Sequence, residues 1–315
     1  MRKDVVSLAE LRFTMHLPQP MTAEQFLRRH KGVSHRMLVR LKRLPNGICC
    51  NGRQIRTIDM VQFGDEIVLT DCEVPSALAP SAAAVPVLGE TDSYIVYNKP
   101  AGMPVHPSQG HHGDTLGNVF AAQLPFRPVY RLDSDTSGIC LIAKSAYAAG
   151  QLQGSTRKTY LALVCGELPT GGTVDAPIGR AEGSVLCRCV RPEGKPAVTH
   201  YTPLRSDGTY TLLSLRLETG RTHQIRVHMK HIGHTLFNDE RYGGNEILKG
   251  THFSKYKQFV NNCFETCPRQ ALHAMTLGFV HPRTGEEMFF TSPLPEDMTN
   301  LIDKWRNYIS NREEL

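Results

Sequence analysis

The chain has 315 residues, of which 40% are hydrophobic and 21% are charged, and its formal net charge is +6. This composition is that of a globular protein with room for one large domain and a small one. No apolar stretch approaches the length of a membrane span, and no hydrophobic signal region follows Met1. We therefore expect a soluble, cytoplasmic monomer without a membrane partner, whose nine cysteines are reduced thiols.

The positive charge is concentrated near the N-terminus. Residues 1–71 contain 12 Lys or Arg against 7 Asp or Glu, which is +5 of the total +6. Between Arg28 and Arg43 there are seven basic residues and no acidic one. A charge run is commonly a solvated helix face, but a one-signed segment attached to a nearly neutral body also indicates a module that binds a polyanion.

Residues 22–72 have the pattern of a small separate unit. Thr22, with Gln25 three residues later, predicts the start of one helix, and Ser34 predicts the start of a second. The second helix carries apolar side chains on one side and basic ones on another, namely Met37, Leu38, Leu41 and Leu44, and Arg36, Arg40 and Arg43. A basic stripe along one helix face suits a phosphate backbone.

A hairpin and a strand complete this unit. Asn51-Gly52 predicts a hairpin turn, and residues 65–69 predict a strand. Two helices followed by these motifs resemble the S4 RNA-binding domain, which implies that the basic stripe contacts RNA. We expect an S4-like α+β domain over residues 1–72, a semi-stiff linker rich in Pro and Ala over residues 73–88, and a main domain over residues 89–315.

The main domain opens with strand and loop signals around two carboxylates. Residues 94–97 predict a strand. Asp133 and Asp135 lie in a short polar turn, which Arg131 precedes and a buried strand at residues 139–143 follows. A loop held by a strand is a usual place for chemistry, although the side chains of such a turn also bond the local backbone.

The second half of the chain predicts short antiparallel strands and three helices. The expected elements are strands at 158–165, 210–217 and 287–291, hairpins across 170–204, and helices at 145–154, from Thr219 or Gly220 to about Ile232, and at 299–311. Short pieces punctuated by Gly favour hairpins over βαβ units. Tyr160 lies in the first of these strands, where a packed core Tyr is the plain alternative to a functional one.

Histidine and cysteine positions raise the question of a metal site. Four histidines lie close together in the sequence, at positions 223, 228, 231 and 234. The cysteines do not show the paired Cys-x-x-Cys spacing of a structural zinc site, so we expect them to bind no metal. Spacing by itself leaves a metal site at the four histidines open. The chain also lacks the Gly-rich fingerprint of a dinucleotide or phosphate loop, so we expect no nucleotide cofactor.

Several motifs, in this order, resemble the RluA family of pseudouridine synthases. They are Asn-Lys-Pro-x-Gly-Met-x-Val-His-Pro from residue 98, Arg-Leu-Asp-x-x-Thr-Ser-Gly from residue 131, Lys-x-Tyr-x-Ala-x-Val-x-Gly from residue 158, Arg-Thr-His-Gln-Ile-Arg-Val-His from residue 221, and Asn-Asp-x-x-Tyr-Gly-Gly from residue 238. The one departure is Tyr130, where many members have His. The resemblance covers about residues 88–296 and implies the pseudouridine synthase fold, an α+β architecture with a mixed, mostly antiparallel sheet flanked by helices and loops.

The same resemblance implies roles for individual residues. Asp133 matches the family's catalytic residue, Arg226 matches the Arg that pairs with it, and Tyr160 matches an active-site Tyr. This Tyr could stack on the uracil or abstract a sugar proton. Arg131 and Arg221 are expected to contact the substrate RNA, Arg131 through a phosphate or in the gap left by the base. The family uses no metal, so the resemblance also implies that the four histidines hold none. Isomerising uridine exchanges a C–N for a C–C bond without redox change, and an ionised carboxylate beside an Arg suits the nucleophile. Attack at the sugar C1′ and attack at the base C6 both remain open.

The expected function is the isomerisation of specific uridines in structured RNA, with ribosomal RNA favoured and transfer RNA as the alternative. Two other classes stay open. A non-catalytic RNA-binding or ribosome-assembly factor would fit the basic N-terminal unit, and a turnover assay separates it from an enzyme. A carboxylate-based hydrolase would need a second active-site acid, which the sequence does not offer.

Overall fold

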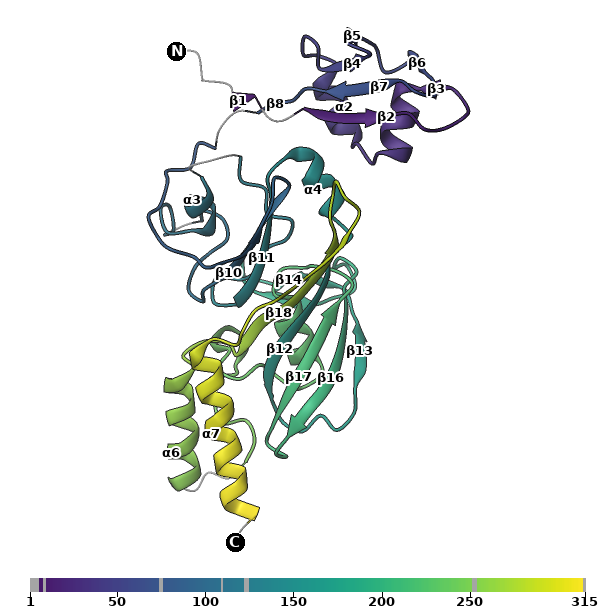
Figure 1. Cartoon of the computed structure of the whole chain (residues 1–315). Helices are drawn as coiled ribbons and strands as arrows, with labels where there is room; N and C mark the ends of the chain where they lie inside the picture. The colour runs from purple at the N-terminus through teal and green to yellow at the C-terminus, as the bar shows by residue number, and fades with distance from the viewer. Residues whose placement is uncertain are drawn as a thin grey trace.

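A nine-stranded sheet forms the centre of the computed structural model, which describes residues 6–7, 10–73, 76–108, 110–121, 125–250 and 254–313. The sheet order is β13-β16-β17-β12-β18-β11-β10-β9, with β19 beside β18 (Figure 1). Every pairing is antiparallel except that of β11 with β18. The predicted α+β class with a mixed, mostly antiparallel sheet is therefore confirmed.

The strands of this sheet come from all parts of the main domain. In spatial order they are β13 (Gly172–Asp175), β16 (Val198–Ser206), β17 (Tyr210–Leu217), β12 (Arg157–Cys165), β18 (Leu272–Val280), β11 (Ser137–Ala143), β10 (Tyr94–Lys99), β9 (Val87–Glu90) and, beside β18, β19 (Glu287–Thr291). A separate hairpin is formed by β14 (Ile178–Arg180) and β15 (Arg188–Val190). The hairpins expected across 170–204 are confirmed, as are the strands at 210–217 and 287–291.

The helix expected from Thr219 or Gly220 begins later than predicted. The observed helix α5 (Gln224–His231) has His223 at its N-cap, in a left-handed conformation with φ 57°. The Gln224 side chain explains the late start, because its Oε1 accepts from the Thr219 hydroxyl at 2.8 Å and from the Arg221 N–H at 2.9 Å. These bonds tie Thr219 and Arg221 to the first residue of the helix, and residues 222 and 223 form a turn that leads into it.

Two helices cover part of one face of the sheet. They are α6 (Ser254–Thr266), which the sequence did not predict, and α7 (Glu296–Glu313), which begins three residues before the predicted start (Figure 1). They share a core with Leu163, Tyr210 and Phe237, against which Trp305 packs. The short helices α3 (Leu116–Phe120) and α4 (Ala146–Leu152) lie on the side of the main domain that is nearer the N-terminal residues (Figure 1). No helix in the described parts of the chain is long and apolar enough to cross a membrane.

The N-terminal residues form a four-stranded sheet with helices packed on it. Its strands, in spatial order, are β2 (Leu11–Thr14), β7 (Glu66–Leu69), β4 (Ile48–Cys50) and β5 (Arg53–Gln54), and its helices are α1 (Ala23–Gln25), continued by a π-helical turn at Phe26–His30, and α2 (His35–Leu41). Short pairs join β1 (Val6–Ser7) to β8 (Cys72–Glu73) and β3 (Met21–Thr22) to β6 (Met60–Val61).

The predicted local signals of this N-terminal module, residues 10–71, are present. Thr22 and Gln25 form a capping box, and the Ser34 hydroxyl accepts from the Met37 N–H at 3.2 Å. Asn51 and Gly52 both have positive φ, 48° and 79°, as a type I′ hairpin turn requires. The second helix is shorter than expected, since it ends at Leu41.

The module contacts the main domain through α4. Tyr147 is 8% exposed and packs into the apolar core of the module, with its ring 5.8 Å from that of Phe13. The Tyr147 hydroxyl and the Gln151 amide both donate to the Lys31 carbonyl, at 3.1 and 3.0 Å. Because α4 directly follows β11, the module is attached to the strand that follows the Asp133 loop.

The segment predicted as a linker packs along the main domain. The Ser81 N–H donates to the Asn118 carbonyl at 3.0 Å, and the Asn118 amide donates to the Ala79 carbonyl at 2.8 Å. Val85 is buried in the main core. Part of the predicted linker is therefore held against α3 and the main core, and its role as a linker stays a prediction.

Gly138, at the start of β11, lies where β11 passes closely beside β18. Its φ is 109°, and an added Cβ would lie 2.2 Å from the Ala274 carbonyl oxygen of β18. We expect Gly138→Ala to lower the free energy of unfolding by about 2–4 kcal/mol, because backbone strain and overpacking combine. Gly208→Ala is the matched control, since Gly208 has φ 83° and no neighbour within 4 Å of a Cβ. Urea denaturation of both variants measures the difference, and equal losses would contradict the packing argument.

Candidate active site

Two buried cations hold the loop that carries Asp133. Lys99, at the end of β10, is 0% exposed, and its Nζ donates to the carbonyls of Ser134, Pro100 and Met103 at 2.8, 2.8 and 2.7 Å. These three acceptors match the three hydrogens of an ammonium group. Burial lowers the pKa of Lys99 to about 8.

The second cation acts one residue further along the loop. Arg269 is 8% exposed, and its Nη1 donates to the Asp135 carbonyl at 2.9 Å. Its Nη2 donates to the Ser137 hydroxyl at 3.2 Å. Asp297 binds the same guanidinium through both carboxylate oxygens, at 2.6 and 3.0 Å. The main chain that follows Asp133 is thus fixed from within the core.

Arg226 joins two carboxylates. Its Nη1 donates to Asp133 Oδ2 at 3.0 Å, while its Nε and Nη2 donate to Asp239 Oδ2 and Oδ1 at 2.7 and 2.8 Å. Burial by itself lowers the pKa of Arg226, but the hydrogen bonds and charges of Asp239 and Asp133 raise it above its ordinary value. The arginine therefore stays charged, and the two-pronged bond to Asp239 fixes the direction of its third nitrogen.

The structure also brings Tyr160 close to this pair. Tyr160 is 6% exposed on β12 and packs in the main core. Burial raises its pKa above the ordinary value, and the nearby charge of Asp133 raises it further. A phenol in this environment keeps its proton. It is therefore suited to contacting the ring of a nucleobase and poorly suited to accepting a proton.

The two arginines expected to contact RNA lie in different surroundings. Arg131 is exposed in the Asp133 loop. Arg221 is half-buried, and its Nε donates to the Pro196 carbonyl at 2.9 Å, so part of its donor capacity is used within the protein. Asp135 is exposed, in contrast to the partly buried Asp133.

The clustered histidines contact separate partners. His228 is buried between the Thr199 hydroxyl and the Ala176 carbonyl, at 2.8 and 2.9 Å, and His234 faces the Cys165 carbonyl. His223 faces the Tyr242 hydroxyl at 2.7 Å. Among the described residues, no group of three or more His, Cys, Asp or Glu is arranged to hold a metal ion.

One arginine of the basic stripe in the N-terminal module has a partner within the protein. Arg40 forms an ion pair with Asp71, which is 6% exposed, while the Arg40 side chain itself is 41% exposed. Arg43 lies beyond the end of α2, and only Arg36 is exposed within the helix. The ion pair is a tertiary contact: Asp71 follows β7 and lies 31 residues from Arg40, so a pattern along one helix does not include it.

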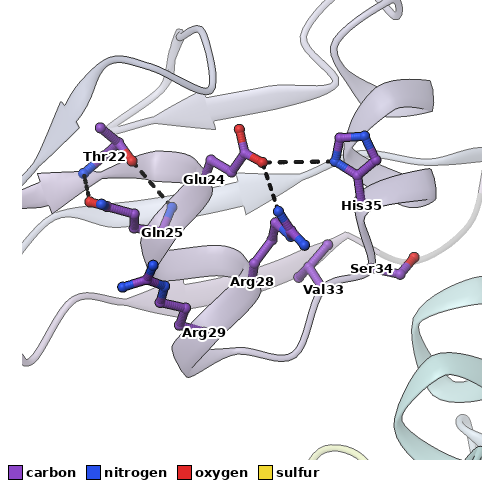
Figure 2. A pocket seen from close by; sticks show the side chains of 8 residues that line it. All are labelled: Thr22, Glu24, Gln25, Arg28, Arg29, Val33, Ser34 and His35. Atoms are coloured by element: carbon purple, nitrogen blue, oxygen red, sulfur yellow. Dashed lines mark hydrogen bonds and ion pairs between the residues drawn. The ribbon is translucent and has the colours of Figure 1, made fainter.

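Other basic side chains of the module line a hollow of about 490 Å³. Figure 2 shows two side chains approaching the Glu24 carboxylate, Arg28 from the π-helical turn and His35 from the start of α2. Their nitrogens lie 3.1 and 3.8 Å from a Glu24 oxygen, while Arg29 points away from Glu24. The lining residues are Thr22, Glu24, Gln25, Arg28, Arg29, Val33, Ser34 and His35.

Sequence reasoning gave no role to Asp239, Lys99, Arg269 or Tyr242. Asp239 and Tyr242 belong to a motif that continues the resemblance, and Lys99 belongs to another, but neither motif states what its residues contact. The signal for Asp239 was its place in that motif, and its partner became visible only with the fold.

Comparisons with known proteins agree with this architecture. A model of the family described as RNA pseudouridylate synthase matches residues 93–231. An uncharacterized RNA pseudouridine synthase from Chloroflexus aurantiacus is 41% identical over 80% of this chain and 79% of its own. Ribosomal large subunit pseudouridine synthase D from Haemophilus influenzae is 38% identical over 80% of this chain and 82% of its own.

A solved structure shares the fold. Human RNA pseudouridylate synthase domain containing 4 superposes with a TM-score of 0.53 and 24% identity, covering 70% of this chain and 92% of that chain.

Asp239→Asn tests whether the shared arginine orients Asp133. The amide keeps the shape of the side chain but removes a charged acceptor, and hydrogen bonds to charged groups contribute about 1.5–3 kcal/mol. We expect kcat to fall by about 10- to 100-fold, with affinity for the substrate little changed. Asp135→Asn is the matched control because Asp135 is exposed. An Asp239→Asn enzyme that melts normally and turns over at the wild-type rate would contradict the assignment.

Proposed function

The chain belongs to the RNA pseudouridylate synthase family, and we propose that it isomerises uridines of ribosomal RNA with Asp133 as the nucleophile. It is thus an RNA pseudouridine synthase, an isomerase. The observation that carries the residue assignment is the contact of Asp133 with an arginine that a second carboxylate fixes. Ribosomal RNA is proposed because relatives from several bacteria are named ribosomal large subunit synthases. We place the reaction in the cytoplasm.

The contacts of Asp133 support a division of labour between its two oxygens. Among the described residues, Arg226 and His223 both approach Oδ2, at 3.0 and 3.9 Å. We assign the attack to the other oxygen, Oδ1. It would bond to C1′ or C6 of a uridine extruded from its stack, and extrusion itself costs a few kcal/mol. The C1′–N1 bond breaks, the uracil turns, and C5 bonds to C1′. The bond to Oδ1 then breaks and restores the carboxylate, C5 loses its proton, and N1 gains one.

The other assigned residues would hold the nucleotide in place. Tyr160 keeps its proton because burial raises its pKa, so we assign it to contact with the uracil ring. Arg131 is exposed beside the nucleophile and would contact an RNA phosphate. Arg221, half-buried, would use its remaining nitrogens in the same way.

We assign RNA contact by the N-terminal, S4-like module to its exposed arginines. Four arginines are fully exposed, namely Arg28, Arg29, Arg36 and Arg43. Arg40 is partly exposed and forms an ion pair with Asp71. Clustered positive charge of this kind makes binding to a phosphate backbone more favourable and makes the affinity depend on salt concentration. Arg28 lies in the hollow of Figure 2, where a phosphate would compete with Glu24 for the guanidinium.

The nucleophile assignment is tested by tritium release from RNA carrying 5-tritiated uridine. The substrate is RNA from cells that lack this gene, because its target uridines are unmodified. We expect wild type and Asp135→Ala to release tritium and Asp133→Ala to release none above background, since loss of a nucleophile removes the covalent step. Equal losses in both variants would overturn the assignment.

The RNA class is read from the same assay. Tritium release from ribosomal RNA alone supports the proposal, whereas release from transfer RNA alone would identify transfer RNA as the substrate. Binding of either RNA without any release would favour a non-catalytic RNA-binding or assembly factor.

The contribution of the module is tested by salt dependence. We expect the double variant Arg28→Ala with Arg29→Ala to bind RNA more weakly, with a slope of log K against log salt that is smaller by about 1 for each phosphate it no longer neutralises. Turnover at saturating RNA should stay close to wild type. Arg40→Ala is the contrast: it leaves the buried Asp71 unpaired, so it should lower the melting temperature with a smaller change in slope. An unchanged slope in the double variant would contradict the module's role.

A further inference from the structure

His223 occupies an unusual backbone position next to Asp133. It is the N-cap of α5 with φ 57°, a conformation uncommon for residues other than Gly. Its side chain is 13% exposed, and its Nε2 lies 3.9 Å from Asp133 Oδ2. Its Nδ1 lies 2.7 Å from the Tyr242 hydroxyl oxygen, with the two rings edge to face. A strained position held between two partners indicates that the direction of the ring matters.

The hydrogen bonds of Tyr242 determine which nitrogen of His223 carries the proton. The Tyr242 oxygen accepts from the Arg188 backbone N–H at 3.1 Å. Tyr242 is 4% exposed, and the described residues offer its hydroxyl hydrogen no acceptor other than His223 Nδ1. The tyrosine therefore donates to Nδ1. A neutral imidazole that accepts at Nδ1 must carry its hydrogen on Nε2, the nitrogen that faces Asp133.

We propose that His223, held in its Nε2–H form by Tyr242, is a positioning residue that donates to Asp133 Oδ2 in the substrate-bound enzyme. The distance of 3.9 Å is longer than a hydrogen bond, but contacts of this kind often shorten when the substrate binds. Together with Arg226, the histidine would keep Oδ2 turned inward and Oδ1 turned toward the nucleotide. This inference rests on the proposed role of Asp133.

The neutral form of His223 is consistent with its surroundings. Burial lowers its pKa, Asp133 raises it, and Arg226, Arg241 and Arg188 lower it. Arg226 already supplies the positive charge beside Asp133. A neutral donor orients the Asp133 carboxylate but does not place a second full positive charge beside it. Such a charge would make the carboxylate a weaker nucleophile.

Nuclear magnetic resonance of the full-length protein labelled with 15N-histidine tests the tautomer directly. We expect Nε2 of His223 to be protonated and Nδ1 to be unprotonated, with the signal assigned by its loss in His223→Gln. In Tyr242→Phe the ring beneath Arg226 is kept and only the hydroxyl is lost. That variant should raise the pKa of His223 and move the acid limb of kcat to higher pH, because the neutral form loses its donor. A protonated Nδ1 in wild type would overturn the proposal.

Two substitutions of His223 separate its donor role from its place in the fold. Gln reaches as far as Nε2 and supplies an amide N–H, whereas Asn is too short but accepts the left-handed backbone well. We expect His223→Asn to lower kcat roughly 10-fold or more with KM little changed, and His223→Gln to retain most of kcat. Wild-type turnover and an unchanged pH profile in His223→Asn would overturn the proposal. Full activity in Asp133→Ala would instead overturn the proposed function.

Discussion

One guanidinium shared by two carboxylates determines the geometry of the candidate site. Asp239, with a fully buried side chain, binds Arg226 through two nitrogens and leaves the third for Asp133. Burying an arginine to 6% exposure is costly unless its charge and its donors are matched, and the two acids meet both requirements. A single pair on the protein surface would leave both side chains free to turn. Here the second acid removes that freedom, so the direction of the first acid is set by the fold.

The same loop is fixed through its backbone. Lys99 and Arg269 bind the carbonyls of the two residues after Asp133, and Gly138 lets the chain pass against β18 where a Cβ would not fit. Beyond β11, helix α4 carries Tyr147 into the N-terminal core. One strand and one helix thus connect the proposed nucleophile to the module proposed to bind RNA. A bound phosphate backbone would therefore lie at a defined position relative to the site.

Local sequence signals located most elements but few contacts. The caps at Thr22 and Ser34 and the strand at 210–217 depend on neighbouring residues alone, and they were predicted correctly. The start of α5 was predicted too early because the bonds of Gln224 to the preceding turn are specific side-chain contacts that periodicity does not report. The ion pair of Arg40 with Asp71 is not visible in the sequence, because the two residues lie 31 positions apart. Asp239 was missed for the same reason, since no local pattern reveals which arginine a carboxylate binds.

The groups around Asp133 have charges that stay constant while the proposed chemistry proceeds. Arg226 keeps its proton because two carboxylates stabilise the cation, and Tyr160 keeps its proton because burial opposes the phenolate. His223 is neutral because burial opposes the imidazolium. Asp133 is then the one member of this set whose charge changes, when the carboxylate becomes an ester and again when it leaves. Because the neighbouring groups keep their charges at both steps, they need little rearrangement. Fixed charges and dipoles are most effective in catalysis when little rearrangement is needed.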